Sequence, residues 1–293
     1  MDIITTVREL RSWRTALPGQ SSVGLVPTMG YLHEGHLSLV RRARAENDRV
    51  VVSIFVNPIQ FGAREDLERY PRDLARDCQL LEEQGVDAVF APTAAEMYPP
   101  HFITYVEPQG PLAREGEGAS RPGHFRGVAT VVLKLFNLTQ PQRAYFGQKD
   151  AQQVAVIKAL VADLHLPIEL VIMPTVREPD GLAMSSRNSY LSPEGRRAAT
   201  VLYRALLAGK EVYERRADAG TAEVVRAMRE TIAREPLARL DYADVRHPET
   251  FQPLERLQAP ALLAVAAFVE TARLIDNFLL RADGSWETGV IVS

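Results

Sequence analysis

Two histidines follow a glycine turn near the start of the chain, within the run PTMGYLHEGH at residues 27–36. The apolar run before it, 23–26, is typical of a buried strand, and residues 37–43 after it are typical of a helix. The start of a helix offers unpaired N–H groups to an anion. His33 and His36 are three residues apart and can face one ligand together. The pattern therefore indicates phosphate chemistry.

A second polar group follows the strand predicted at 49–56. The strand ends at Asn57-Pro58, and Gln60 comes shortly after it. Asn57 and Gln60 carry donors and acceptors without charge, which suits a polar organic substrate with hydroxyl or carboxyl groups. A turn with an Asn cap before proline explains Asn57 equally well, so both interpretations stay open.

A third group lies in the run YFGQKD at 145–150, where a short strand leads into a glycine turn and a helix. Gly147 permits a ligand to approach the backbone closely. Lys149 stands at a helix start, which disfavours a cation unless an anion is near, so it indicates a phosphate partner. Asp150 can cap the helix and still contact a ligand. Gln153, one turn further on, is expected to face the same crevice.

A fourth group lies at 180–188, in the run DGLAMSSRN. The hydroxyls of Ser185 and Ser186 and the guanidinium of Arg187 follow a glycine turn. Such a set can hold a polyphosphate as a flexible clamp. A solvated loop before the helix predicted from Pro193 is the alternative.

Strand-like apolar runs alternate with helical ones through the first part of the chain. Strands are predicted at 23–28, 49–56, 86–91, 144–146 and 168–173, and helices at 37–45, 72–84, 130–138 and 152–164. Near-continuous Val and Ile strands separated by helices predict a parallel sheet covered on both faces. Such sheets bind ligands outside the carboxyl ends of their strands. Each of the four polar groups begins at such an end.

The pattern changes after about residue 176. Helices are predicted at 193–215 and 221–234, and strands at 240–246, 262–268 and 272–277, which indicates a smaller α+β domain. The expected division is a first domain of residues 1–176 and a second of residues 177–293. The segment 110–127, rich in Gly, Arg and Pro, is expected to form an irregular, partly mobile loop.

Composition excludes several classes of protein. The 293 residues are 46% hydrophobic and 24% charged with a net charge of −3, which gives no field for polyanions and makes nucleic acid a poor partner. A single cysteine, Cys78, allows no intrachain disulfide. Neither a signal peptide nor a membrane-spanning apolar run is recognisable, so a cytoplasmic protein is expected. Zinc-site spacing and the Gly-x-Ser-x-Gly elbow of hydrolases are also missing from the sequence.

Taken together, these runs resemble one known family. Five runs are similar to the motifs of pantoate–β-alanine ligases and occur in the family's order. They are residues 27–36, SIFVNPIQF at 53–61, RPGHFRGV at 121–128, FGQKD at 146–150 and DGLAMSSRN at 180–188. Weaker similarity continues through 272–277, whereas the terminal segment 279–293 does not align.

The resemblance implies a Rossmann-like first domain, a smaller C-terminal lid domain, a Mg²⁺ requirement and a homodimer. It implies an ATP-dependent ligase of the nucleotidylyltransferase superfamily. Pantoate would attack the α-phosphate of ATP to give pantoyl adenylate and diphosphate, and β-alanine would then attack the acyl carbon to give pantothenate and AMP.

The resemblance also implies roles for single residues. Gln60 would bind pantoate and β-alanine, Gln153 would bind pantoate, and His36 would be the proton donor. The catalytic donors would be His33, His36, Lys149, Ser185 and Arg187. The residues that bind ATP would be Met29, Gly30, Tyr31, Leu32, His33, Glu34, Gly35, His36, Gly147, Gln148, Lys149, Asp150, Val176, Met184, Ser185, Ser186 and Arg187. The metal ligands are not implied.

Two positions depart from the family pattern. Tyr31 stands where a smaller residue, often Asn, is usual, and Gln148 replaces the more usual Glu or Lys. Neither change removes a proposed donor, so activity is expected. Two other functions stay open: another His-x-Gly-His nucleotidylyltransferase that acts on a phosphorylated alcohol, or a nucleotide-binding regulator without catalysis. The uncharged Asn57, Gln60 and Gln153 favour the ligase over the first.

Overall fold

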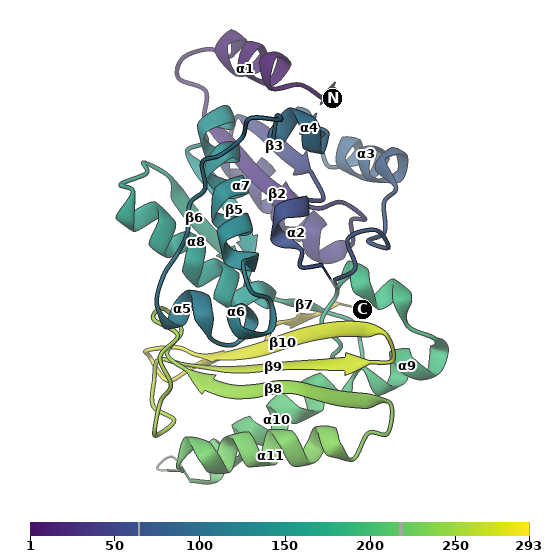
Figure 1. Cartoon of the computed structure of the whole chain (residues 1–293), viewed down its shortest axis with the longest axis vertical. Coiled ribbons are helices and arrows are strands. Elements are labelled where there is room, and N and C mark those ends of the chain that lie inside the picture. Colours follow the sequence, from purple (N-terminus) through teal and green to yellow (C-terminus); the bar gives the residue numbers. More distant parts are fainter. Residues whose placement is uncertain (64, 217–218, 293) are drawn as a thin grey trace. The chain divides into compact units, whose positions relative to one another are not determined.

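The computed structural model describes residues 1–63, 65–216 and 219–292. Contacts divide the chain into two compact units (Figure 1). The first unit consists of Met1–Gln109, Arg121–Gly147 and Val156–Met173, and the second of Gly110–Ser120, Gln148–Ala155 and Pro174–Ser293. The division into domains of residues 1–176 and 177–293 stays a prediction.

The first unit contains a parallel sheet. Among its described residues, six strands lie in the order β1-β4-β3-β2-β5-β6, and every neighbouring pair is parallel. The strands are β1 (Asp2–Ile4), β2 (Val23–Thr28), β3 (Arg49–Ile54), β4 (Ala88–Phe90), β5 (Arg143–Gly147) and β6 (Glu169–Met173). The main helices are α1 (Val7–Ala16), α2 (Glu34–Glu46), α3 (Leu74–Glu83) and α7 (His124–Thr139), with α4 (Ala94–Met97) and the short η1 (Pro58–Gln60). Helix α8 (Ala151–Asp163) begins in the second unit and belongs to the first from Val156 onward. The predicted parallel sheet is confirmed.

Both faces of this sheet are buried. Val50 and Val52 of β3 pack in one cluster with Leu39 and Val40 of α2. Val51 between them is also fully buried, and because side chains alternate along a strand it points to the opposite face. The near-continuous apolar pattern of β3 follows from this double covering.

The second unit is built on an antiparallel sheet. In the described chain its four strands lie in the order β11-β10-β9-β8, and α10 and α11 pack against β8, β9 and β10 (Figure 1). The strands are β8 (Ala238–Arg246), β9 (Ala261–Val269), β10 (Ala272–Leu280) and β11 (Trp286–Glu287), and β7 (Val176–Arg177) pairs with β12 (Val290–Ile291). The helices are α5 (Pro111–Arg114), α6 (Glu117–Ser120), α9 (Pro193–Ala198), α10 (Val201–Arg215) and α11 (Thr221–Ala233), with η2 (Gln148–Asp150) and η3 (Ser186–Tyr190). The predicted smaller α+β unit is confirmed.

Two predicted elements are wrong in detail. The helix expected at 193–215 is interrupted between α9 and α10, where the Thr200 hydroxyl donates to the Arg197 carbonyl (2.8 Å) and competes with the helical backbone pattern. The loop expected at 110–127 contains α5, α6 and the first turn of α7. Its glycines support turns between these elements: Gly110 and Gly123 both have positive φ and precede α5 and α7.

The terminal segment left unaligned by sequence contains β11 and β12 as far as it is described, that is, to residue 292. Strand β12 lies parallel to β7, with Val290 opposite Val176. The end of the described chain therefore supports the segment that leads to Ser185 and Arg187.

Candidate active site

Paired imidazoles begin helix α2, directly after strand β2 and a glycine turn. Gly30 has φ of +82°, and an added Cβ would lie 2.9 Å from the Ile54 side chain, so only glycine fits. His33 caps the helix: its Nδ1 accepts from the Gly35 N–H (3.2 Å), while His36 Nδ1 accepts from the His33 N–H (3.3 Å). The ring centroids are 4.1 Å apart. The two rings lie side by side, and their binding of one ligand together stays a prediction.

These backbone contacts fix the tautomer of both rings. A ring nitrogen that accepts a hydrogen bond carries no proton, so the neutral form of His33 and of His36 holds its proton on Nε2. Each ring can therefore act as an Nε2–H donor. Two such donors at the positive end of a 13-residue helix suit the oxygens of an anion.

The glycine turn is held by a carboxylate that the sequence analysis missed. Asp77 of α3 accepts from the Tyr31 N–H at Oδ2 (2.7 Å) and from the Leu32 N–H at Oδ1 (2.8 Å). Its side chain is 1% exposed. Burial raises the pKa of the Asp77 carboxyl, although the two N–H donors oppose that shift. Asp77 thus positions the backbone from which His33 follows.

Tyr31 adopts a backbone conformation that explains why a smaller residue is usual there. Its φ is +53°, in the left-handed region that Asn tolerates better than Tyr. The Arg76 guanidinium lies 5.5 Å from the ring centroid of Tyr31 and donates to the Leu32 carbonyl (3.0 Å). Arg76 and Asp77, adjacent on α3, thereby support this less common residue.

Asp77→Asn should loosen the turn. Asn keeps the size but presents one oxygen to two N–H groups and turns an NH₂ toward the other, which leaves a buried donor unsatisfied at a cost of about 1–3 kcal/mol. We expect a melting temperature lower by a few degrees and a ligase rate lower by about tenfold. Steady-state kinetics and thermal denaturation measure both.

The matched control for this substitution lies on the same helix. Asp73 caps α3 by accepting from the Arg76 N–H (3.1 Å), and Asn is an equally good cap. Asp73→Asn should therefore leave both rate and melting temperature unchanged. Equal behaviour of the two variants would show that Asp77 has no special role.

The second polar group forms a buried network in the first unit. Asn57 Nδ2 donates to Gln60 Oε1 (2.9 Å), and Tyr98 Oη donates to Asn57 Oδ1 (2.8 Å). Gln60 Nε2 in turn lies 3.2 Å from Met29 Sδ, so the first and second groups meet. Asn57 is 1% and Gln60 7% exposed. Asn57 orients the Gln60 amide, and the direct contact of either with a substrate stays a prediction.

Helix α7 supports Gln60 from behind. His124 Nδ1 lies 2.9 Å from the Gln60 carbonyl, and the Arg121 guanidinium lies 3.1 Å from His124 Nε2. A Cβ at Gly127 would lie 2.5 Å from the Ile59 carbonyl, so glycine lets the helix approach η1. The run at 121–127 therefore leads into a helix that supports the predicted pantoate residue.

The third group is divided between strand end and helix start. Gly147 ends β5, and an added Cβ there would meet no protein atom within 4 Å, so the space in front of its backbone is open to a ligand. Lys149 lies in η2, directly before α8, with Nζ 3.7 Å from Asp150 Oδ2. Gln148 is buried and donates to Asn277 Oδ1 (3.3 Å). Gln153 is half-buried on α8.

The fourth group is a capped turn in the second unit. Ser185 caps η3 by accepting from the Arg187 N–H (3.3 Å), and Ser186 is 6% exposed. Met184 N donates to the Val176 carbonyl (2.9 Å), which aligns the segment with β7. A 3₁₀ turn therefore stands where the sequence allowed either a flexible clamp or a solvated loop.

The predicted residues thus form one group in each unit. The first unit contains residues 29–36, Asn57, Gln60 and Gly147. The second unit contains Gln148, Lys149, Asp150, Gln153, Val176, Met184, Ser185, Ser186 and Arg187. The binding of one ligand by both groups stays a prediction.

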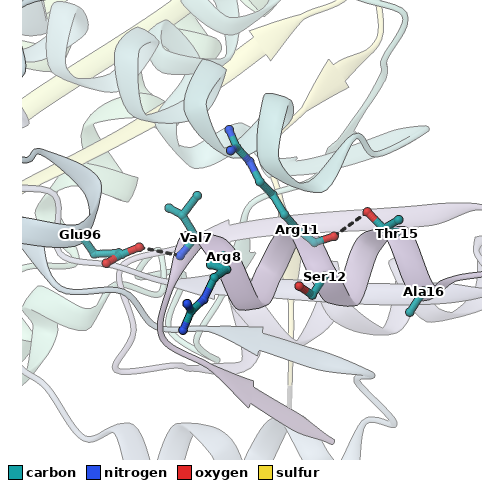
Figure 2. A pocket seen from close by; sticks show the side chains of 7 residues that line it. All are labelled: Val7, Arg8, Arg11, Ser12, Thr15, Ala16 and Glu96. Atoms are coloured by element: carbon teal, nitrogen blue, oxygen red, sulfur yellow. Dashed lines mark hydrogen bonds between the residues drawn. The ribbon is translucent and has the colours of Figure 1, made fainter.

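An open groove beside helix α1 takes no part in either group (Figure 2). Its contacts are those of an ordinary helix: Glu96 accepts from the Val7 N–H (2.7 Å) at the helix start, and the Thr15 hydroxyl donates to the Arg11 carbonyl (2.8 Å). The residues that line it are Val7, Arg8, Arg11, Ser12, Thr15, Ala16 and Glu96. We assign it no role in the chemistry.

Within residues 1–63, 65–216 and 219–292 no three His, Cys, Asp or Glu side chains gather as a metal-binding cluster. None of the helices in that part of the chain has the length and apolar character needed to cross a membrane.

A parallel sheet covered on both faces, with paired imidazoles at a helix start, places the chain among α/β proteins, whose sheets bind ligands at the carboxyl ends of their strands. The sequence model described as pantoate–beta-alanine ligase matches residues 2–279. The chain therefore belongs to the pantoate–β-alanine ligase family, and it is an enzyme that condenses pantoate with β-alanine.

Individual relatives agree with this assignment. A pantothenate synthetase of Roseiflexus castenholzii is 60% identical over 285 residues, which are 96% of this chain and 100% of that protein. One from Moorella thermoacetica is 54% identical over 284 residues, which are 97% and 100% of the two chains. The similarity therefore extends through both units and is not confined to the motifs.

Solved structures show the same fold. The crystal structure of a pantothenate synthetase from Thermus thermophilus has a TM-score of 0.90 at 58% identity, over 94% of this chain and 98% of that one. A pantoate–β-alanine ligase from Francisella tularensis, crystallised with beta-gamma ATP and β-alanine, has a TM-score of 0.78 at 38% identity, over 95% and 97%.

Proposed function

We propose that this enzyme condenses pantoate with β-alanine through a pantoyl-adenylate intermediate, at the expense of ATP. The observation that carries the proposal is the pair His33 and His36, whose Nδ1 atoms are occupied by backbone N–H groups so that their Nε2–H donors can meet phosphate oxygens. The Francisella tularensis ligase, crystallised with beta-gamma ATP and β-alanine, supports both ATP and β-alanine as substrates.

In the first step a pantoate carboxylate oxygen attacks the α-phosphorus of ATP. A new P–O bond forms, the bond from the α-phosphorus to the bridging oxygen breaks, and diphosphate leaves. Negative charge develops on the phosphoryl oxygens, so preorganised donors are the main requirement. Such donors are supplied by His33, His36, Lys149, Ser185 and Arg187, and His36 is the proton donor. The other proposed residues of 29–36, 147–150, 176 and 184–187 surround the nucleotide.

In the second step the β-alanine amine attacks the acyl carbon of the adenylate. The C–N bond forms, the amine loses a proton and AMP leaves with the electrons of the C–O bond. Gln60 and Gln153 would hold pantoate, with Gln60 also beside β-alanine. Uncharged amides suit these small polar molecules, and Asn57 and Tyr98 keep the Gln60 amide in one orientation.

Mg²⁺ is proposed to enter with ATP rather than in a cage of protein ligands. Mg²⁺ retains several waters and usually binds through one or two carboxylates and the substrate phosphates. A dedicated cluster of three such side chains is not required for this mode. When bound, the ion would neutralise charge on the phosphates, and the residues above would still orient them.

The assembly and the location of the enzyme are also proposals. A homodimer is proposed from the family resemblance, and light scattering on the purified protein would measure it. A cytoplasmic location is proposed because the reaction consumes ATP, which that compartment supplies.

The adenylate route is tested by isotope exchange. With pantoate and no β-alanine, the enzyme should transfer label from diphosphate into ATP, because the first step is reversible and complete by itself. Exchange should stop without pantoate and on addition of EDTA, and the full reaction should yield AMP. Formation of ADP would instead indicate an acyl-phosphate route and would overturn the proposal.

A further inference from the structure

Two adjacent polar residues in the middle of strand β10 are buried although the strand lies in an apolar sheet. Asp276 is 3% and Asn277 5% exposed. Since side chains alternate along a strand, the two point to opposite faces of β10. Leu274, Phe278 and Leu280, on the Asp276 face, belong to the main core of the second unit. Polar side chains therefore stand at two successive buried positions of the strand where apolar ones would be expected.

On one face, Asn277 holds the turn that contains Lys149. Its Nδ2 donates to the Gln148 carbonyl (3.0 Å) and to the Lys149 carbonyl (2.8 Å). Only the NH₂ end of an Asn can donate to two carbonyls, so these contacts define the amide orientation and Oδ1 faces the Gln148 amide (3.3 Å). All three contacts go to η2.

On the other face, Asp276 holds the segment that leads to Ser185. Both of its oxygens accept from Arg177, at 2.6 and 2.8 Å. Arg177 is fully buried and also donates to the Gly181 carbonyl (3.0 Å) and to the Thr288 carbonyl. The planar guanidinium thus fixes the loop 178–182 to β10 through a bidentate ion pair.

We infer that Asp276 and Asn277 are positioning residues for nucleotide binding, which fix the Lys149 turn and the Ser185–Arg187 turn relative to each other through one strand. The two Cα atoms are about 3.8 Å apart across a trans peptide, and the Asn277 N–H donates to Asp276 Oδ1 (2.8 Å). Movement of either turn would strain the other. The inference rests on the proposed function, in which both turns bind ATP.

The position of the contacts separates this role from general stabilisation. Asn277 bonds the main-chain carbonyls of Gln148 and Lys149 rather than their neighbours in α8, so it sets where the Lys149 side chain starts. A misplacement of the order of 1 Å at a reacting group can reduce a rate by about a hundredfold. A buried apolar residue would stabilise the sheet without defining that position.

The test replaces the amide without changing its size. In Asn277→Asp an oxygen faces the two carbonyls, which repel it, so η2 must shift. The expected result is a KM and a Kd for ATP raised by about tenfold or more, with the KM for β-alanine within about twofold of wild type. Isotope exchange and calorimetric titration with ATP measure these. If Asn277→Asp does not fold, Asn277→Ala removes both donors without adding a charge.

Leu280→Ala is the matched control on β10, because Leu280 is fully buried in the core and pairs with Ala261 and Trp286 of the neighbouring strands. It should lower the melting temperature while the KM for ATP stays unchanged. A double-mutant cycle supplies a second readout: in Lys149→Ala, the Asn277 substitution should raise the KM for ATP by less than it does in wild type, since both act through one turn.

Each outcome decides between the two proposals. If wild type exchanges label and binds ATP but Asn277→Asp leaves KM and Kd unchanged, or if it behaves like Leu280→Ala, the positioning role is overturned and the function stands. If wild type binds ATP without exchange, the adenylate route fails and the Kd of the variant still tests the positioning role. If wild type neither exchanges label nor binds ATP, both are overturned.

Discussion

His36→Ala should reduce pantoate-dependent exchange of diphosphate by about a hundredfold or more, while the protein still folds. Acid–base groups and single preorganised donors each contribute about 10²–10⁴-fold to such steps. The substitution removes the Nε2–H donor proposed for the phosphates. It also removes the Nδ1 acceptor of the His33 N–H, which costs about 1 kcal/mol as a lost cap. Exchange rates and a melting curve measure the two effects separately.

His36→Asn distinguishes the two contributions. The amide oxygen of Asn can take the place of Nδ1 and accept from the His33 N–H, but nothing replaces Nε2. If the imidazole acts on the phosphates, His36→Asn should regain most of the melting temperature and none of the exchange. Recovery of exchange in His36→Asn, or a nearly normal rate in His36→Ala, would reduce His36 to a helix cap.

The elements of the parallel sheet could be predicted because each strand is covered on both faces. Strand β3, for instance, carries three successive valines at 50–52 without polar alternation, and its observed bounds Arg49–Ile54 fall within the predicted 49–56. Helix α1 was not predicted, although its capping box of Thr6 and Glu9 was a readable signal. At the break between α9 and α10 the Thr200 hydroxyl donates to the Arg197 carbonyl, and the hydrophobic periodicity of the sequence does not indicate such a local contact.

The candidate site could be predicted where it consists of local motifs, and not where it consists of distant contacts. Turn residues such as Gly30 and His33 lie together in the sequence, so their types and spacing are visible. Asp77 reaches a turn 46 positions away, and Asn277 reaches one 128 positions away. No local pattern links such pairs.

A signal for these supporting residues does exist in the sequence. Asp77 stands four residues before the buried Leu81, on the same face of an amphipathic helix. An unpaired carboxylate on a buried face is costly, so its presence there implies a partner. In the same way, Asp276 and Asn277 interrupt an apolar strand on both of its faces. Buried polar residues that contradict the surrounding pattern indicate where a site is held in position.

Lys149→Ala should reduce the exchange rate by about a hundredfold or more and leave the melting temperature unchanged or higher. Lys149 lies at the positive end of α8, where the helix dipole disfavours a cation. Its side chain is 20% exposed and is paired with Asp150 at 3.7 Å, a weak compensation. The local cost implies that Lys149 is retained for an anion, which the proposed ATP phosphates supply. The substitution should therefore lower activity without lowering stability.

Lys158→Ala is the control, because Lys158 is an exposed lysine of the same helix and its removal changes the net charge equally. It should alter neither property by more than experimental error. Lys149→Arg keeps the charge but replaces a compact ammonium with a planar fork, so it should recover only part of the rate. Exchange kinetics and thermal denaturation of all three variants measure this. If Lys149→Ala matches Lys158→Ala in both assays, Lys149 is an ordinary surface lysine, and the cation that faces the phosphates must be sought elsewhere.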